Sequence, residues 1–240
     1  NVDYAAVSNS DASDGIVVVA KDSADLGGNL NWRFTTIVPG EEIVWTGKSG
    51  SQWANPENWD LGRVPVATDR VRIPAAGPNT PVLNGAAILN RLEVAAGGAL
   101  ALGGNDLTVT NDLVVAGALS ASATETVTLL GDASFAGAVV SPARSLLLVA
   151  GDRSRVIDFG GADFHGIRVT QGAGTLIVGG GLAADEWRME IPPGASFDCA
   201  FAAGRTVCAR RFLVLGDAAA TNATLRSTVP DSAWGLQATE

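Results

Sequence analysis

The sequence predicts an all-β protein and, within that class, a right-handed parallel β-helix (β-solenoid) of roughly eight to ten coils. Three observations carry this prediction. Short apolar alternations recur along the chain, turns of Gly, Asn and Asp separate them, and long-chain helix formers are scarce. Lys occurs at two positions and Met and His at one each, whereas Gly supplies 29 of the 240 residues. This composition is typical of strands joined by tight turns.

The spacing of the alternations distinguishes two architectures built from many short strands. Strands of a β-sandwich follow one another at about 8–12 residues, whereas this chain repeats at six to eight residues after Ile88. Three such strands make a coil of about 20–25 residues, and Gly or Asn supplies the bend at each corner. We expect Leu107, Val109, Leu113 and Val115 to face the lumen. The other alternations are Leu92/Val94, Leu100/Leu102, Val127/Leu129, Leu146/Leu148, Ile167/Val169 and Leu176/Val178.

Charge and hydropathy argue against several partners. Acids outnumber bases by 25 to 16, the net charge is −9 and no basic run occurs, so nucleic acid and anionic membranes are not expected partners. No run of about 18 apolar residues occurs, so no membrane insertion is expected. Ala183 to Arg188 is the one stretch where a single helical turn is expected.

The two cysteines, Cys199 and Cys208, lie nine positions apart. The chain has one His and no further cysteines, which are too few ligands for a zinc site. We therefore expect a local disulfide, which would fit an exported protein. The alternative is a pair of buried thiols that act as small apolar side chains.

Several segments resemble large secreted or surface bacterial proteins with parallel β-helix modules. Residues 43–74 carry their WTG…W…P-x-NW…VP…D-x-V-x-IP element, and residues 92–109 and 164–176 resemble their coils. Residues 1–34 resemble the closing coils of the same units. The resemblance implies two parts: 1–34 as closing coils that stack on the preceding unit, and 35–240 as a solenoid that residues 43–74 enter. It implies a structural role without assigned chemistry.

The order of these pieces differs from the family pattern. In the family, closing coils follow a segment like residues 225–237, which here stands at the opposite end of the chain. Joining Glu240 to Asn1 restores the order and keeps the apolar alternation in phase. The resemblance thus implies one circularly permuted unit of a tandem array, and the alternative is an arbitrary boundary of the chain. The residues expected at the resulting head-to-tail interface are Val2, Tyr4, Trp234 and Leu236.

Two groups of polar residues are candidates for a binding or catalytic site. The first could hold a structural Ca²⁺, which prefers several oxygen ligands, but it lacks the D-x-D-x-D-G spacing; the alternative is a set of turn caps. It comprises Asp11, Asp14, Asp22, Asp25, Asn29 and Asn31. The second could serve the polysaccharide lyases and hydrolases that parallel β-helices also host. It comprises Asp152, Arg153, Arg155, Asp158 and Asp163.

Neither group predicts an enzyme. Carboxylates and arginines at such spacing are common by chance, and no GxSxG element surrounds a serine that could pair with His165. His165 next to Phe164 is interpreted as structural. We therefore expect no catalytic residues and no bound cofactor.

The tryptophans of the entry segment, Trp45, Trp53 and Trp59, allow two interpretations. Exposed rings would stack on sugars, whereas buried rings would pack a loop or plug the end of the solenoid. The nearby prolines favour a rigid, packed loop.

The sequence-based hypothesis is a structural module of an extracellular filament or surface adhesin. Copies assemble head to tail, because an open coil end carries unpaired backbone groups and apolar surface that a second copy would cover. A cell-surface or matrix polysaccharide is a further expected partner. The alternative function is a carbohydrate-binding or polysaccharide-cleaving β-helix module.

Overall fold

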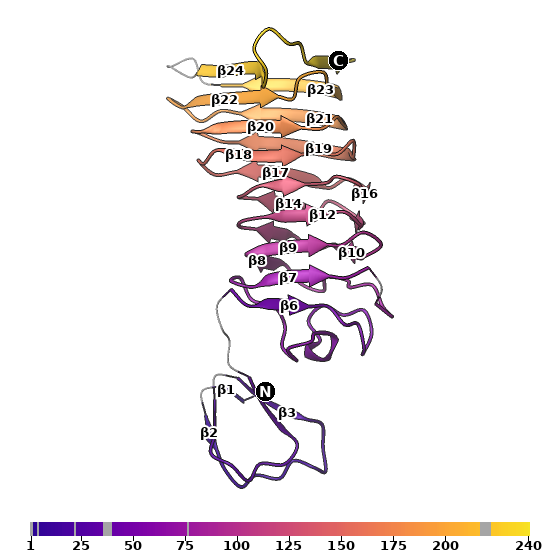
Figure 1. The fold of residues 1–240 in the computed structure, drawn as a ribbon, viewed down its shortest axis with the longest axis vertical. Coiled ribbons are helices and arrows are strands. Elements are labelled where there is room, and N and C mark those ends of the chain that lie inside the picture. The colour runs from indigo at the N-terminus through magenta and orange to yellow at the C-terminus, as the bar shows by residue number, and fades with distance from the viewer. Residues whose placement is uncertain (1, 4, 22, 36–39, 76, 217–221) are drawn as a thin grey trace.

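The computed structural model of the chain describes every residue except 1, 4, 22, 36–39, 76 and 217–221. Its named strands pair in parallel and wind into a β-solenoid of about 10 turns, as Figure 1 shows. The one helix among the described residues is the short 3-10 helix η1 (Pro56–Asn58). The predicted all-β class and the solenoid are therefore confirmed.

Stacked sides of successive coils form three sheets, which we call walls. The first wall contains β6 (Glu42–Val44), β7 (Arg70–Ile73), β9 (Arg91–Val94), β12 (Leu113–Val115), β15 (Ala133–Ser134), β18 (Arg155–Asp158), β20 (Thr175–Gly179), β22 (Ser196–Phe201) and β24 (Asn222–Ser227). The second wall contains β8 (Ala87–Leu89), β11 (Leu107–Val109), β14 (Thr126–Leu129), β17 (Leu146–Ala150), β19 (Asp163–Thr170), β21 (Leu182–Glu190), β23 (Thr206–Leu215) and β25 (Gly235–Ala238). The third wall contains β10 (Ala99–Ala101), β13 (Ala118–Ser120) and β16 (Val139–Ser141).

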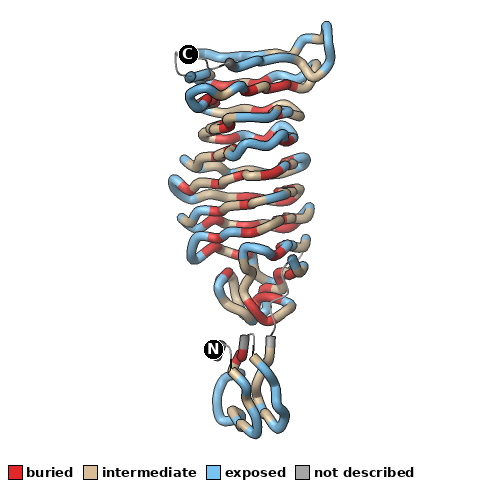
Figure 2. The backbone as a smooth tube through the Cα atoms, turned by 90° about the vertical axis from the view of Figure 1, so that its left-hand side faces the viewer, coloured by how far each residue is buried: buried red, intermediate tan, exposed pale blue. Residues whose placement is uncertain are grey.

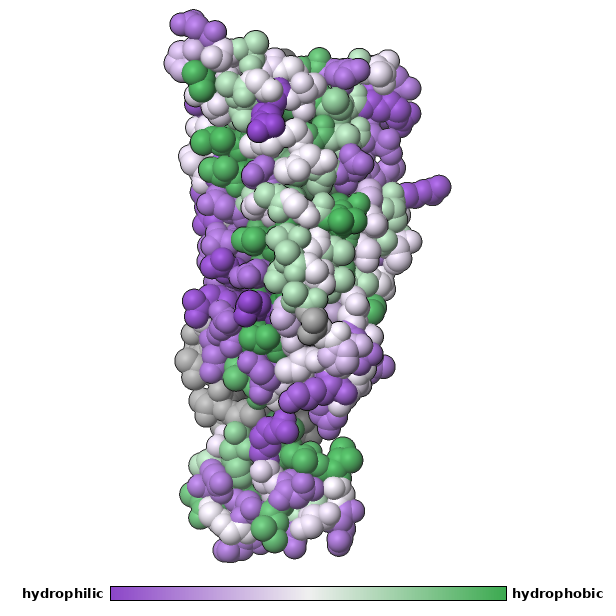
Figure 3. All heavy atoms as spheres, turned by 45° about the vertical axis from the view of Figure 1, so that its right-hand side comes forward, coloured by the Kyte–Doolittle hydropathy of each residue, from purple (hydrophilic) through white to green (hydrophobic). Residues whose placement is uncertain are grey.

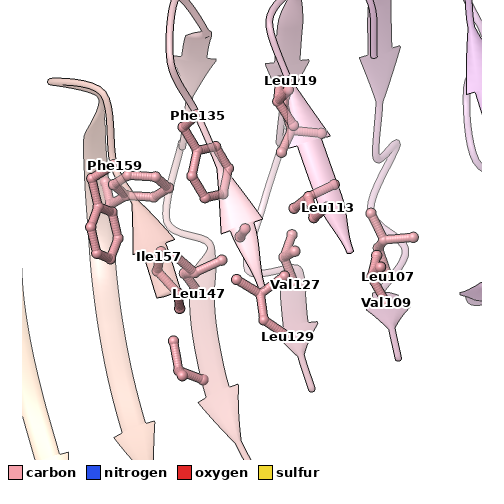
Figure 4. Close-up of a cluster of buried hydrophobic side chains, with 14 of the residues drawn as sticks. Leu107, Val109, Leu113, Leu119, Val127, Leu129, Phe135, Leu147, Ile157 and Phe159 are labelled. Atoms are coloured by element: carbon pink, nitrogen blue, oxygen red, sulfur yellow. The ribbon is translucent and has the colours of Figure 1, made fainter. Parts of the chain in front are cut away.

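The core consists of apolar columns that run along the lumen. Leu113 lies in register between Leu92 on the coil below and Ala133 on the coil above. The four side chains expected in the lumen are all fully buried, so that prediction is confirmed. Figure 4 shows how side chains from successive strands stack on one another, and Figure 2 shows buried and exposed residues alternating along each coil. The four side chains predicted to face the lumen are those of Leu107, Val109, Leu113 and Val115.

The corners between the walls depend on small or amide side chains, as predicted. At the corner between the first and third walls, a Cβ on Gly117 would collide with the carbonyl oxygen of Gly98 on the coil below. At another corner, Asn105 Nδ2 donates a hydrogen bond to the Leu83 carbonyl at 2.9 Å. Corners of neighbouring coils therefore approach so closely that larger residues would push the coils apart.

The phase of one strand differs from the expected alternation. β17 buries Leu147 and Val149, whereas Leu146 and Leu148 face outward and are half-buried. Its register with β14 places Leu147 on Val127, which is itself a lumen residue. Because three leucines follow one another, both phases of the strand are apolar in the sequence, and only the pairing with neighbours selects one.

The expected helical turn at residues 183–188 is wrong. This stretch lies inside β21, where it pairs with β19 below and β23 above. Trp187 and Met189 within β21 are buried, so the lumen face of the stack holds this segment extended.

The coils change shape where the third wall ends at β16. β19, β21 and β23 have eight, nine and ten residues, although strands of three to five were expected. The registered pairing of these strands skips one residue in each, His165, Asp185 or Arg210, and the inward–outward alternation changes phase there. β19 also packs against β16. One bent strand therefore forms both the third and the second side of each upper coil.

The first 35 residues form a separate small unit of short coils. It contains β1 (Val2–Asp3), β2 (Ala6–Val7), β3 (Val18–Lys21), β4 (Ala24–Asp25) and β5 (Trp32–Thr35). Sheets β1-β3-β5 and β2-β4 include no strand of the solenoid, and in Figure 1 the unit lies beyond β6 as an open ring. Its described hydrophobic residues include only Val19 and Ala20 as buried, while Ile16 is 91% exposed. The unit therefore has almost no core of its own.

Candidate functional site: the two ends of the solenoid

The N-terminal end of the solenoid is closed by a Trp cluster, which comprises Trp45, Trp53 and Trp59. All three rings are buried, and Trp59 makes edge-to-face contacts with Trp45 and Trp53 at centroid distances of 5.0 and 4.7 Å. Trp59 Nε1 donates to the Trp53 carbonyl at 2.8 Å, and Trp45 Nε1 donates to the Asn79 carbonyl at 2.7 Å. No ring face is free to stack on a sugar. The three rings are therefore packed within the loop, the arrangement that the nearby prolines favour, rather than exposed as a platform.

A buried ion network supports the Trp cluster. The guanidinium of Arg63 donates to both carboxylate oxygens of Asp69, which is completely buried, and to Glu41 at 3.1 Å. The hydrogen bond to Asp69 raises the pKa of Arg63 against the opposing effect of burial. Asp69 also accepts a hydrogen bond from the Val66 N–H at 2.8 Å, so the carboxylate ties the loop to the start of β7. Sequence reasoning missed this network.

The C-terminal end of the solenoid, which we call the open end, is formed by β24, β25 and the end of β23. β24 and β25 are the last strands of their walls. Leu225 and Leu236 lie in register on lumen residues of the coil below, yet they remain 36% and 45% exposed, and no coil among the described residues lies above them. Trp234 is half-buried and stacks on Phe201 at 4.0 Å. Val2 is half-buried beside Ala20, and Tyr4 lies outside the described residues.

Half of β23 is also uncovered. β25 pairs only with Thr206–Ala209, which leaves the second half of β23 without a strand above it in the described structure. Phe212 and Val214 face the lumen there, and Val214 is 40% exposed. Beside the uncovered half of β23 lies a pocket of about 440 Å³, lined by Thr170, Arg188, Glu190, Ile191, Pro192, Leu215 and Gly216.

The predicted disulfide is not formed, because both cysteines are free thiols. Cys199 is buried on the lumen face of β22, and burial raises its pKa well above the ordinary value. Cys208 stands between the buried residues Val207 and Ala209 of β23 and faces outward, where its Sγ lies 3.6 Å from Gln237. One sulfur atom therefore faces the lumen from the first wall and the other faces outward from β23, despite their proximity in sequence.

Two of the candidate Ca²⁺ ligands, Asp11 and Asp25, act as turn caps. Asp25 Oδ1 accepts hydrogen bonds from the Gly27 N–H at 2.9 Å and from Asn29 Nδ2 at 2.6 Å. Asp11 accepts from the side chain and backbone of Ser13, which lowers the pKa of Asp11. The described residues contain no group of three or more His, Cys, Asp or Glu side chains that could hold a metal ion. Asp14 is exposed, Asn31 Nδ2 donates to the Ala12 and Gly15 carbonyls, and Asp22 lies outside the described residues.

The residues considered for polysaccharide cleavage do not converge on a cleft. Arg155 is buried and donates to backbone carbonyls at a corner, including that of Gly151 at 3.0 Å, and burial lowers its pKa. Asp152 and Asp158 each accept a hydrogen bond from a backbone N–H of a turn. Asp163 is exposed, Arg153 donates to Asn111 at 3.3 Å, and His165 lies 2.8 Å from Asp185 on the outer surface.

The third wall carries a column of small apolar side chains on the outer surface of the solenoid. On the third wall, Ala99, Ala118 and Val139 form one outward-facing column in register. Figure 3 shows this region as a pale green area at mid-height, bordered by hydrophilic side chains. No helix of the described chain is long and apolar enough to cross a membrane.

Comparison with known proteins gives one likeness. Residues 44–134 match a family described as "Domain of unknown function (DUF8693)". This segment runs from the Trp cluster to β15 and is less than half of the chain. No curated protein and no solved structure matches the chain. The candidate site therefore rests on the geometry of the two ends.

Proposed function

We propose that this chain is a structural module of an extracellular filament or surface adhesin, and that copies assemble head to tail by stacking their coils. The β-solenoid fold supports a structural or binding module in general. The observation that carries the finer proposal is the asymmetry of the ends: the N-terminal end is closed by buried tryptophans, whereas the C-terminal end exposes lumen residues and two edge strands.

The small N-terminal unit supplies a matching partner for the open end. It has parallel coils, few buried side chains and exposed apolar residues such as Ile16, Leu26 and Leu30. In Figure 1 this unit and the C-terminus lie at opposite ends of the long axis. A contact between different surfaces at opposite ends of a long axis extends the stack instead of closing it into a ring, so its repetition makes a filament.

Location and chain connectivity are part of the same proposal. The extracellular or cell-surface location rests on the resemblance to secreted bacterial β-helix proteins. The stacked copies are either separate chains or repeats of one longer chain, and the stacking contact is the same in both cases. The carbohydrate module is not favoured, because the tryptophans that would form its platform are buried.

The test compares two single substitutions by sedimentation velocity and electron microscopy. Leu236→Asp places a charge on the open end, and Ile88→Asp places the same charge on the flank, where Ile88 is 54% exposed. We expect the parent and Ile88→Asp to form concentration-dependent linear oligomers and Leu236→Asp to remain monomeric with an unchanged circular dichroism spectrum. A parent that stays a monodisperse monomer at high concentration, or a Leu236→Asp variant that assembles like the parent, would contradict the proposal.

A further inference from the structure

We propose that β1 of a second copy adds in parallel to the uncovered half of β23 and so extends the second wall across the joint. This inference rests on the proposed function and deepens it, because it names the strand that enters and the wall that receives it. β25 pairs with the first half of β23, which forms the third side of the last coil, so β1 enters beside it on the second side. The other two sides of the joint follow from this placement: β2 covers β24, and the segment at Asp11 covers β25.

The receiving site is the second half of β23, above which the described structure has no strand. β23 runs from Thr206 to Leu215, and β25 above it covers only the first four residues. The chain continues along β23 as far as Arg210, whose carbonyl accepts a hydrogen bond from the Glu240 N–H at 2.8 Å. Beyond that point the described structure places no strand on β23, so its outer backbone groups and the lumen side of Val214 are open. A strand that enters here removes an unpaired edge.

The connection lengths of the three-walled coils give each wall a recognisable place in the sequence. Four positions separate the end of β11 from the start of β12, so the passage from the second to the first wall is short. Three positions separate β12 from β13, the passage from the first to the third wall. Six positions separate β13 from β14, the passage back to the second wall. In the three coils that have a separate strand on each wall, the passage back to the second wall spans six, six and five positions, and no other passage of the same coil is longer. In the upper coils one bent strand forms the third and second sides, and the passage from the second to the first wall is the long one, with seven positions between β23 and β24.

The first coil of the small unit shows the same order of lengths. Three positions separate β1 from β2, four separate β2 from Asp11, and seven separate Asp11 from β3. The long connection precedes β3, which pairs with β1, so both strands correspond to the second wall. The small unit has a separate third side, the bridge of Asp11 with Leu30, so it is compared with the coils that have a strand on each wall. In those coils the other two corners span two to five positions, and assigning β1 to either other wall would place the seven-position connection there. In the second coil of the small unit only two positions separate Leu30 from the start of β5. The first coil is therefore the one whose connection lengths match those of the solenoid.

The side chains agree with this placement. Val2 lies in register with Ala20, which is completely buried, so Val2 belongs to the inner column of the small unit. On β23, Phe212 stacks on Trp187 at 6.2 Å and belongs to the lumen column of the solenoid, as does Val214. Placing Val2 of the second copy above Val214 continues one apolar column through the joint and covers surface that is exposed in the single chain.

Cysteine cross-linking between full-length chains tests this placement. Both native cysteines are first replaced by C199A and C208S, and chains carrying Val2→Cys are mixed with chains carrying Val214→Cys under mild oxidation. Adjacent strands lie about 4.8 Å apart, which permits a disulfide between facing positions. We expect a cross-linked heterodimer from this mixture. The matched controls pair Val2→Cys with Leu225→Cys or Leu236→Cys, which lie on the other two sides of the open end, and we expect the heterodimer to be lost.

The outcomes separate this inference from the proposed function. Cross-linking of Val2→Cys to Leu225→Cys or Leu236→Cys instead of Val214→Cys overturns the wall assignment and leaves head-to-tail stacking in place. Linear oligomers without any cross-link also overturn the assignment. Loss of both cross-linking and oligomers, with each chain folded by circular dichroism, removes the assignment and the proposed function together.

Discussion

The closed and open ends of the solenoid terminate the same first wall in opposite ways. Below β6, the Trp cluster fills the end of the lumen and a buried ion network anchors its loop. At the other end, Leu225 and Leu236 occupy lumen positions, but nothing in the described structure covers them. The difference teaches that stacking alone buries the middle of a solenoid, whereas each end needs its own dedicated side chains.

The physical reason lies in the repeat. A lumen residue in a middle coil has a similar coil below and above it, so the same apolar alternation satisfies every level. An end coil lacks one neighbour, and its edge strands and inner side chains face water unless a different segment covers them. Large aromatic rings do this at the closed end because each removes much apolar surface from water. The open end has no equivalent segment among its described residues.

The largest effect is expected from a charge in a middle coil. Leu113→Asp would place a carboxylate in a fully buried column with no partner, and we expect a loss of more than about 5 kcal/mol in the free energy of unfolding. Val114→Asp, on the outward face of the same strand, is the matched control and should cost little. Urea unfolding of both variants measures the difference. Similar losses for the two variants would show that Leu113 does not face a closed lumen.

A smaller loss is expected when the ion network of the closed end is broken. Asp69→Ala leaves the buried Arg63 without its main partner, which costs about 3–5 kcal/mol. At the open end, Asp198→Ala breaks the exposed pair with Arg226, and such surface pairs contribute about 0–1 kcal/mol. Thermal unfolding of the two variants therefore compares the ends directly. Equal shifts in melting temperature would mean that the closed end is not locked by its buried network.

The buried carboxylate of Glu125 makes stability depend on acid pH. Burial alone would raise its pKa, but hydrogen bonds from the N–H groups of Ser122, Glu125 and Ala123 and from the Ser122 hydroxyl lower it to about 2. The ordinary value of 4.5 applies in the unfolded chain. The carboxylate therefore stabilises the fold fully above about pH 4.5, and this contribution is lost as the pH falls toward 2.

Replacement of this carboxylate tests the pH dependence. We expect Glu125→Gln to cost about 1.5–3 kcal/mol at pH 7, because charged hydrogen bonds at a corner are replaced by weaker ones. The difference from the parent should shrink as the pH falls below 4.5. Glu93→Gln, in an exposed pair with Arg72, is the control and should be nearly neutral. A difference that is constant from pH 7 to pH 3 would contradict the role of the carboxylate.

The smallest effect is expected at the open end itself. Leu225→Ala should cost the single chain less than about 1 kcal/mol, because the leucine is already 36% exposed and the site can collapse freely. The same change in the middle, Leu113→Ala, should cost about 2–5 kcal/mol. Unfolding is measured at a concentration where the chain is monomeric. A large loss for Leu225→Ala under that condition would mean that the open end is covered in solution.

Much of the solenoid could be predicted because its signals are local. Gly98, Gly117 and Asn105 lie at corners where neighbouring coils approach, and the apolar pairs between such corners became the lumen columns. A strand only has to alternate correctly to join a stack in which every neighbour follows the same rule. Trp59 and its neighbours also revealed a packed segment, since aromatic residues among prolines rarely remain exposed together.

The errors arose where a residue's surroundings depend on register rather than on its own neighbours in sequence. Leu146 and Leu147 are equally apolar, and only the pairing of β17 with β14 places Leu147 inside. Cys199 and Cys208 are close in sequence, but they lie on different walls, and the alternation of β22 and β23 directs Cys199 into the lumen and Cys208 outward. The partnership of Arg63 with Asp69 depends on how a loop folds beneath the first coils, which no periodic pattern encodes.

By itself, the sequence determined the repeated part of this protein: the parallel coils, their corner residues and the apolar columns, because each coil presents the same short pattern to its neighbours. The tertiary structure alone decided how the ends differ. It showed that buried rings and a buried ion pair close one end. It also showed that β25 leaves half of β23 uncovered at the other. The physical reason is that an end is defined by the neighbour it lacks, and the stacking of strands distant in sequence determines which side chains lack one.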